Sequence, residues 1–457
     1  MNHSLRIALA AVVLVPGLGR AGTTRESPQP NVILVLADDF GWGDLGGPGG
    51  MPVEAPHLDR MAKEGVRFAR FYVAAPICSP SRCGIITGQF PARWRITSYL
   101  QTRAGNRACE QADFLDPEAP SLPRMLKAAG YATAHVGKWH LGGGRDVRDA
   151  PRFAAYGYDL GAGTWESPEP HPDLTARDWI WSSDDPVKRW DRTRWMVDRT
   201  LEFLRANADT PCFVNLWLDD THAPWVPTAE DQQVGKGGRA TGKGDTPSRL
   251  RGVVAEMDRQ LGRLLDALRG READRPTVVL FFGDNGPLPT FDGRRAGGLR
   301  GGKLSLYEGG IRVPCIAWGP GVVPAGLIND TTVFAAVDLL PTLARLCGAA
   351  PKGDPPSDGE DLGDALRGRS PTRTKLLFWE YGRNDTSFAY PKVGKDRSPN
   401  VAVRDGDWKL LVNADGTGAE LYDLADDPRE ARDLAADRPD VTRRLTDSAL
   451  TWRKSLP

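Results

Sequence analysis

Several side chains that could bind a metal ion directly follow short apolar runs of the sequence. Asp38 and Asp39 follow one run, and Asp284 and Asn285 follow another. These groups offer only oxygen ligands, which suit a hard cation such as calcium or magnesium better than zinc. Each pair alone is more typical of a helix cap or a turn. Three carboxylates brought together without a metal would repel one another, so the four side chains together predict a metal site.

Cationic and titratable side chains follow further runs. Lys138 and His140 come after one run, His222 comes after another, and Lys303 follows two glycines. This mixture suits an anionic substrate and proton transfer at its leaving group. The glycines before Lys303 do not form a phosphate-binding P-loop, because the required glycine spacing and the following Ser or Thr are missing.

The segment 76–88 reads Pro-Ile-Cys-Ser-Pro-Ser-Arg-Cys-Gly-Ile-Ile-Thr-Gly. Ser79 followed by Pro80 is typical of a helix N-cap and first helical residue, which predicts Cys78 at a helix N-terminus beside Arg82. Backbone N–H groups and a guanidinium there make a good seat for a tetrahedral oxyanion. A lone cysteine more often only packs, but the surrounding pattern favours a functional role.

The apolar runs resemble strands that are buried on both faces, as in a largely parallel sheet covered by helices. Amphipathic stretches between them predict helices, so the order is βαβ-like. Ligands bind beyond the carboxyl ends of such strands. We therefore expect an α/β fold with a large, mostly parallel sheet whose one rim carries the polar side chains. The predicted strands are 31–37, 131–136, 212–218 and 277–283, and the predicted helices are 57–64, 121–129, 190–206 and 250–268.

These motifs resemble those of the type I, formylglycine-dependent sulfatases, an arylsulfatase-like family of the alkaline phosphatase-like superfamily. The family signature is Cys-x-Pro-Ser-Arg followed after three residues by Leu-Thr-Gly. The stretch 78–88 matches this signature except that Ile86 replaces Leu. The resemblance covers nearly the whole chain after its N-terminal segment, with further matching stretches at 31–44, 137–142, 221–224, 283–286, 302–303, 307–310, 408–410 and 420–424.

The resemblance implies that Cys78 is oxidised to formylglycine (3-oxoalanine) by a formylglycine-generating or sulfatase-maturing enzyme. One oxygen of the hydrated aldehyde would attack sulfur, and loss of a proton from the second would expel sulfate. It also implies one calcium ion, held by Asp38, Asp39, Asp284 and Asn285 together with residue 78.

The remaining site residues also take their roles from the resemblance. Arg82 and Lys138 would orient the hydrate, and His140 would act as the base for its collapse. His222 and Lys303 would contact the sulfate and the leaving oxygen. The residue that donates the proton to the leaving group is left open among His140, His222 and Lys303.

A sulfated carbohydrate is the leading substrate class, because tryptophan faces stack on sugar rings and the chain is expected to be exported. A phosphonate or phosphate ester hydrolase of the same superfamily is one alternative. A non-catalytic sulfoglycan-binding protein is another, if Cys78 stays unmodified. The candidate residues for selecting the organic part of the substrate are Trp165, Trp179, Trp181, Trp190, Trp195, Arg93, Trp94, Arg95, Tyr99 and Arg103.

The N-terminus has the pattern of an export signal. Arg6 precedes the apolar run 7–15, and small residues follow up to Ala21. The run is too short to cross a bilayer, which needs about 20 apolar residues. We expect an exported periplasmic or extracellular protein without a stable membrane anchor.

Composition bounds the remaining possibilities. The 457 residues include 59 Lys and Arg and 59 Asp and Glu, so no basic field exists to gather nucleic acid. Hydrophobic residues at 40% with 26% charged residues are typical of a globular chain. Six cysteines are too few for a disulfide scaffold. Cys83 and Cys109 are possible disulfide partners, whereas Cys212 and Cys315 fall in apolar strands as inert thiols.

The C-terminal part predicts a smaller α+β unit. The stretch 340–371 is rich in Pro, Gly and Asp and indicates a surface connection. The runs 375–381 and 401–412, with Asp405-Gly406 as a hairpin turn, predict an antiparallel sheet, and 439–454 predicts a final helix. The expected organisation is a signal peptide at 1–21, a catalytic domain at 22–370 and a C-terminal α+β subdomain at 371–457.

Overall fold

The computed structural model describes residues 29–46, 49–174, 184–228, 246–270, 275–350 and 357–457. The predicted signal segment lies outside these residues. The helices are α1 (Pro56–Lys63), α2 (Cys78–Thr87), α3 (Arg103–Ala108), α4 (Leu122–Ala128), α5 (Arg192–Ala206), α6 (Pro247–Arg269), α7 (Glu308–Ile311), α8 (Leu339–Leu346), α9 (Gly363–Leu366) and α10 (Pro439–Lys454). Within the described part of the chain, none of them combines the length and apolar character needed to cross a membrane.

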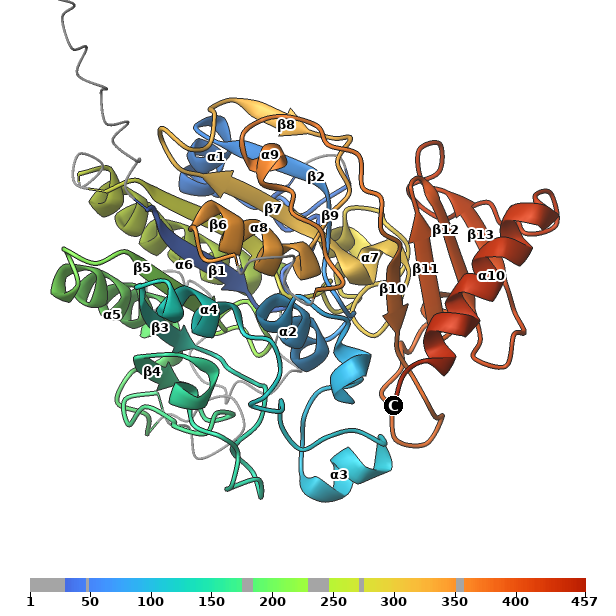
Figure 1. Cartoon of the computed structure of the whole chain (residues 1–457), viewed down its shortest axis with the longest axis horizontal. Coiled ribbons are helices and arrows are strands. Elements are labelled where there is room, and N and C mark those ends of the chain that lie inside the picture. The colour runs from blue at the N-terminus through green and yellow to red at the C-terminus, as the bar shows by residue number, and fades with distance from the viewer. Residues whose placement is uncertain (1–28, 47–48, 175–183, 229–245, 271–274, 351–356) are drawn as a thin grey trace, which may run out of the picture.

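A nine-stranded sheet forms the centre of the molecule (Figure 1). Its strands are β1 (Asn31–Ala37), β2 (Val66–Tyr72), β3 (Ala132–Gly137), β4 (Leu160–Gly163), β5 (Cys212–Leu218), β6 (Thr277–Gly283), β7 (Arg312–Trp318), β8 (Leu327–Asn329) and β9 (Phe334–Ala335). Their order is β4-β3-β5-β1-β6-β7-β2-β8, with β9 also paired to β2. Strand β7 is antiparallel to both of its neighbours, and the other pairings are parallel. The expected α/β fold with a mostly parallel sheet is confirmed.

Helices cover both faces of this sheet. Alternate side chains of a strand point to opposite faces. In β1, Val32, Leu34 and Leu36 join one buried core with α2, α4 and α8, whereas Ile33 and Val35 join another with α1, α5 and α6. This two-sided burial explains why β1 is apolar from Val32 to Ala37 instead of alternating.

The predicted elements agree closely with the observed ones. The runs 31–37, 212–218 and 277–283 match β1, β5 and β6, and the run 131–136 corresponds to β3. The predicted helices correspond to α1, α4, α5, α6 and α10, with small shifts at their ends.

A separate four-stranded antiparallel sheet lies beside the large one in Figure 1. It consists of β10 (Leu377–Glu380), β11 (Val401–Asp405), β12 (Trp408–Val412) and β13 (Glu420–Asp423). The turn from β11 to β12 contains Gly406, whose φ of 57° favours glycine. Helix α10 packs on this sheet and buries Leu445, Ala449 and Trp452. The predicted small sheet and final helix are confirmed.

The prediction that 340–371 is a surface connection is wrong for much of its length. Leu340 and Leu343 in α8 and Leu366 in α9 are fully buried. The amphipathic spacing of these leucines outweighs the high proline and glycine content around them. Residues 351–356 lie outside the described part of the chain.

A buried ion network joins the small sheet to the body of the protein. Lys409 Nζ of β12 lies 3.0 Å from Glu308 Oε1 of α7 and 2.8 Å from Glu430 Oε1. Tyr72 of β2 donates a hydrogen bond of 2.6 Å to Glu308 Oε2. The side chains of Lys409, Glu308 and Glu430 are fully buried, so each charge depends on its partners.

Replacing Lys409 with methionine should destabilise the protein strongly. The change leaves Glu430 without its Lys409 partner and facing Glu308, which keeps the more distant Arg312, 3.6 Å from its Oε2 atom. Breaking a buried ion pair in this way lowers the free energy of unfolding by about 3–5 kcal/mol. Urea denaturation measures the effect, and Lys454→Met, which removes an exposed charge from α10, serves as the control. Equal midpoints for the two variants would contradict this role.

His135 makes stability depend on pH. Burial lowers its pKa to about 3, whereas an unfolded histidine titrates near 6.5. Between these values the unfolded chain binds one proton more than the folded chain, so this part of the stability is lost as the pH falls from about 6.5 towards 3. The side chain packs against the rings of Trp139, Phe153, Tyr158 and Trp217.

The variant His135→Phe keeps an aromatic ring and removes this titration. Its free energy of unfolding should fall less steeply with acid than that of the wild type, by up to about 1.4 kcal/mol per pH unit. In the wild type the carbonyl of Gly137 lies 3.2 Å from His135 Nε2. In the variant this carbonyl still accepts a hydrogen bond from the backbone N–H of Thr164. Denaturation curves at pH 7, 6 and 5 test this, and parallel pH dependences would contradict it.

Candidate active site

The polar side chains predicted to share a rim follow four adjacent parallel strands. Ala37 of β1 is level with Leu218 of β5 and with Gly283 of β6. Gly137 of β3 is level with Trp217 of β5. Because these strands end at the same height, the segments after them start at one edge of the sheet.

Cys78 is the first residue of α2, as expected, and is 2% exposed. The prediction that Ser79 caps this helix is wrong, because Ile77 is the N-cap residue, with φ of −158°. Ser79 Oγ instead accepts a hydrogen bond of 2.9 Å from the backbone N–H of Leu100. Since α2 begins at Cys78, the unpaired N–H groups of its first turn lie next to that side chain.

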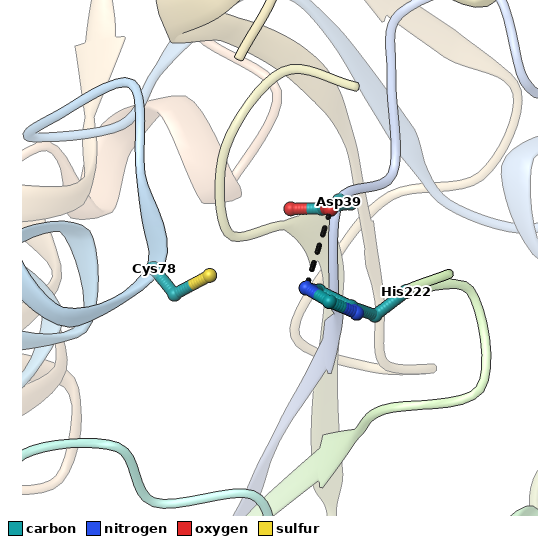
Figure 2. Close-up of side chains that lie close together, drawn as sticks. All are labelled: Asp39, Cys78 and His222. Carbon is teal, nitrogen blue, oxygen red and sulfur yellow. Dashed lines mark ion pairs between the residues drawn. The ribbon is translucent and has the colours of Figure 1, made fainter. Parts of the chain in front are cut away.

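The Cys78 thiol lies among charged groups. Its Sγ atom is 3.6 Å from Asp38 Oδ1, 3.6 Å from Lys138 Nζ and 3.7 Å from Lys303 Nζ. Figure 2 shows the sulfur pointing toward Asp39 and His222. Burial raises the pKa of the thiol to about 12, although the two lysines oppose this shift. An unmodified Cys78 is therefore a thiol at neutral pH, and a thiol is a poor nucleophile.

Four oxygen-bearing side chains meet beside Cys78. Ligand atoms of Asp38, Asp284 and Cys78 lie within 4.8 Å of one another. Asp39 is held against the same group, because its backbone N–H donates to Asp284 Oδ1 at 2.9 Å and Asn285 Nδ2 donates to its Oδ1 at 2.7 Å.

Two features of this cluster fit a bound cation. Burial, followed by the charge of Asp38, raises the pKa of Asp284 to about 7, so the negative charge of this carboxylate is only partly compensated by its neighbours. Asn285 Oδ1 is buried and has no hydrogen-bond partner among the described residues. An all-oxygen set with an unused amide oxygen matches the donors preferred by calcium.

Arg82 ties the carboxylates to α2. Its Nε and Nη2 atoms donate to Asp284 Oδ2 at 3.0 and 2.7 Å, and its Nη1 atom donates to the carbonyl of Lys138 at 2.6 Å. The guanidinium also lies 5.1 Å from the centre of the Trp217 ring. Arg82 therefore holds the loops after β3 and β6 against the helix that carries Cys78.

Each of the two lysines pairs with one carboxylate. Lys138 Nζ lies 2.6 Å from Asp38 Oδ2, and Lys303 Nζ lies 2.7 Å from Asp39 Oδ1. Although burial opposes the charged form, the carboxylates raise the pKa of both lysines. With Arg82, three cations balance three carboxylates, so an added divalent cation would leave the centre positive and suited to an anion.

His222 follows β5 and approaches the same centre. Its Nε2 atom lies 3.7 Å from Asp39 Oδ2, the contact marked by the dashed line in Figure 2, which is an ion pair only when the ring is protonated. Its Nδ1 atom lies 2.6 Å from the carbonyl of Ala223, so Nδ1 carries the proton. Burial lowers the pKa of His222 to about 4, which leaves the ring neutral at pH 7.

His140 follows β3 but makes no hydrogen bond to Cys78 in the described structure. Its Nε2 atom lies 3.0 Å from the carbonyl of Leu100 and 3.3 Å from Glu166 Oε2. Burial, and then the positive charges of Lys138 and Arg82, hold the pKa of His140 well below its usual range. The ring is neutral, and its contacts are with Leu100 and Glu166 rather than with Cys78.

The sequence did not single out the residues that support the two histidines. Glu166 contacts His140, and Arg189 donates to the carbonyl of His222 at 3.1 Å. Arg189 and Arg192 both bind the Asp219 carboxylate, which has a structural role. No motif marks these residues, since each depends on a partner distant in sequence.

Cys83 and Cys109, the possible disulfide partners, are not bonded to each other, because all six cysteines are free and buried. Cys83 lies within α2, and the Cys109 thiol donates instead to the carbonyl of Ser387 at 3.4 Å. Cys212 and Cys315 are buried thiols in β5 and β7, as predicted.

The tryptophans and arginines expected to select the substrate are in part engaged elsewhere. Arg93 pairs with Asp358 at 2.8 Å, and the Trp195 ring packs on His171. Trp179 and Trp181 lie outside the described residues. Selection of the substrate by these side chains stays a prediction.

Comparison with known proteins agrees with this geometry. The Sulfatase family model matches residues 30–349. N-acetylgalactosamine-6-sulfatase of Canis lupus familiaris is 34% identical over 83% of this chain and 73% of its own length. N-acetylgalactosamine-6-O-sulfatase of Bacteroides thetaiotaomicron is 27% identical over 93% of both chains.

The fold of this chain is similar to that of a solved structure. The crystal structure of Ps i-CgsB in complex with k-i-k-neocarrahexaose has a TM-score of 0.72 at 24% identity, covering 93% of this chain and 92% of the other. The family model covers well over half of the 457 residues. The chain therefore belongs to the sulfatase family, and it is a sulfuric ester hydrolase.

Proposed function

We propose that the chain removes sulfate from a sulfated carbohydrate, using a formylglycine made from Cys78 and one calcium ion. The names of the dog and Bacteroides relatives, both N-acetylgalactosamine sulfatases, support the carbohydrate part of this proposal. Its other parts rest on the charged surroundings of residue 78.

The single observation that carries the proposal is the position of Cys78. The residue is buried at the first turn of α2, between two lysines and beside the carboxylates. Burial raises the pKa of this thiol to about 12, which makes it a poor nucleophile at neutral pH. A hydrated aldehyde at this position supplies an oxygen nucleophile and a second hydroxyl whose deprotonation expels sulfate.

The calcium ion would be held by Asp38, Asp39, Asp284 and Asn285, together with the modified residue 78. It would supply positive charge where the substrate and nucleophile carry negative charge. Asn285 Oδ1, buried without a hydrogen-bond partner among the described residues, is the donor whose role this ion would explain.

The remaining side chains handle the anion and its protons. Lys138 and Lys303 present ammonium groups within 4 Å of Cys78 Sγ, where they can bind sulfate oxygens. Arg82 orients the carboxylates and α2. His222 Nε2 faces the centre with a lone pair and would have to gain a proton before it could donate one to the leaving oxygen. His140 would accept the proton released when sulfate is expelled.

The proposal also requires a formylglycine-generating or sulfatase-maturing enzyme, because the cysteine does not oxidise itself to an aldehyde. Export to the periplasm or the outside of the cell, as the N-terminal segment indicates, would place the enzyme where polymeric sulfated glycans occur.

Mass spectrometry of the tryptic peptide 71–82 tests the modification. We expect the mass that results when the –CH2SH group of Cys78 becomes –CHO. Unmodified cysteine in protein from its natural host, with glycan binding but no turnover, would contradict the proposal and favour a binding protein.

Matched aryl sulfate and aryl phosphate esters test the reaction. Because a sulfate monoester carries one negative charge and a phosphate monoester carries two near neutral pH, the centre must discriminate between them. We expect a higher kcat/KM for the sulfate ester. A preference for the phosphate ester would instead favour a phosphate or phosphonate ester hydrolase.

A further inference from the structure

Glu166 lies behind His140, in a loop that the sequence motifs do not mark. We propose that Glu166 is a positioning residue that holds His140 with its Nδ1 lone pair available as the proton acceptor. This inference rests on the proposed function, because it deepens the role of His140 in that reaction.

Three contacts connect Glu166 with His140 and its surroundings. The backbone N–H of His140 donates to the carbonyl of Glu166 at 3.0 Å. Glu166 Oε2 lies 3.3 Å from His140 Nε2, and Glu166 Oε1 accepts from Arg145 at 2.6 Å. The Glu166 side chain is 7% exposed, so its carboxylate has little access to water and depends on these partners.

The contacts select one tautomer of the imidazole. Both neighbours of His140 Nε2, the Leu100 carbonyl and the Glu166 carboxylate, are acceptors. An imidazole nitrogen between two acceptors must carry the proton. The other ring nitrogen, Nδ1, then holds a lone pair. Nδ1 is buried and has no hydrogen-bond partner among the described residues.

Leu100 connects this arrangement to the helix of Cys78. Its carbonyl accepts from His140, and its N–H donates to the hydroxyl of Ser79, the residue next to Cys78. Lys138, two residues before His140, reaches within 3.6 Å of Cys78 Sγ. His140 is thus connected to the nucleophile segment through Leu100 and through Lys138, while Glu166 lies beside the same ring nitrogen that contacts Leu100.

The position of Glu166 suits one proton transfer. When sulfate is expelled, a hydroxyl on residue 78 loses its proton to His140 Nδ1. The O–H bond breaks and an N–H bond forms, the electron pair of the O–H bond makes the carbonyl, and the C–O bond to the sulfate group breaks with its electron pair leaving on sulfate. The imidazolium then carries a positive charge beside the Glu166 carboxylate, the logic by which a buried acid supports a histidine base.

Glu166 would have a purely structural role if it served only to pair Arg145, whose guanidinium also lies 5.6 Å from the centre of the Trp165 ring. The two roles predict different effects of replacing Arg145. If Glu166 only pairs with Arg145, replacing either residue should have the same effect. If Glu166 supports His140, only replacing Glu166 removes that support.

Kinetics and NMR on the full-length enzyme test the proposal. Glu166→Gln keeps the shape of the side chain and removes its charge, and we expect kcat to fall about 10–100-fold with a smaller change in KM. Arg145→Gln should reduce kcat less. Glu169→Gln removes a nearby charge that contacts the N–H of Phe153 instead and is the matched control.

Histidine ring 15N spectra supply a readout independent of turnover. The His140 signals, assigned with His140→Gln, should show a single Nε2–H tautomer in the wild type. In Glu166→Gln the Nε2–H proton should move upfield, because the negative charge beside the Nε2–H group is lost.

The outcomes separate this inference from the proposed function. An Nδ1–H tautomer in the wild type overturns the inference whether or not a variant folds. A Glu166→Gln variant with wild-type kcat and spectra also overturns the inference. An Arg145→Gln variant that shows the full loss of kcat with an unchanged His140 signal overturns it as well. If Cys78 is unmodified and the protein inactive, the proposed function fails, while the tautomer and its response to Glu166→Gln still report on the positioning.

Discussion

Cys78→Ala should abolish sulfate ester hydrolysis, with kcat/KM falling at least about 10⁴-fold, as expected for loss of a covalent nucleophile. Alanine cannot be converted to an aldehyde, and the centre would keep its cations without a group to attack sulfur. Binding of the substrate should survive, because Lys138 and Lys303 remain. A fluorogenic aryl sulfate measures the rate, and inorganic sulfate as a competitive ligand measures the binding.

Cys83→Ala is the matched control for this variant. Cys83 lies on the same helix, is fully buried, and has a thiol whose pKa burial also raises to about 12. It contacts Thr87 rather than the charged centre. We expect Cys83→Ala to retain wild-type kcat. An equal loss in both variants would show that the effect comes from disturbed packing of α2 and not from a nucleophile.

Removal of calcium should have the second largest effect. Treatment with a chelator should lower kcat at least about 100-fold, because a bound cation contributes several kcal/mol of charge stabilisation. Without calcium, the only positive charges that the described structure places beside Asp38, Asp39 and Asp284 would be those of Arg82, Lys138 and Lys303. The melting temperature should fall as well, since an ion that binds only the folded state at 100 times its Kd adds about 2.7 kcal/mol. Added Ca²⁺ should restore both quantities.

Asp39→Asn tests whether the proposed ligands hold that ion. Asp39 is the better choice than Asp284, because Asp284 also binds Arg82. The variant should need at least about tenfold more Ca²⁺ for half-maximal reactivation, since a ligand charge is lost. Asp266→Asn, which removes a 57% exposed carboxylate of α6, should reactivate like the wild type. Full activity of chelated wild-type enzyme would overturn the metal proposal.

Much of the fold and the centre could be predicted because the relevant signals are local. Strands β1, β5 and β6 are almost entirely apolar, as is typical of strands buried between two layers of helices. Parallel strands that end level bring whatever follows them to one edge. Asp38, Lys138 and Asp284 could therefore be grouped without knowledge of any contact.

Other elements lacked such a signal. Strand β2 carries Arg67 and Arg70 among its aromatic residues and has no apolar run that predicts it, although it pairs with β7 and β8 near one edge of the large sheet. Ser79 directly before Pro80 resembles a helix cap, yet the cap is Ile77, two residues earlier, and the Ser79 hydroxyl accepts a hydrogen bond from Leu100.

The amino-acid sequence by itself determined which side chains reach the rim, because burial on two faces and the ends of strands are properties of contiguous residues. Only the tertiary structure decided that Glu166 meets His140, that Arg189 holds the His222 loop, and that Cys83 and Cys109 stay apart. These contacts join segments whose relative placement depends on how whole loops pack, and hydrogen bonds form only when both partners arrive within about 3 Å. No periodicity in the chain encodes that distance.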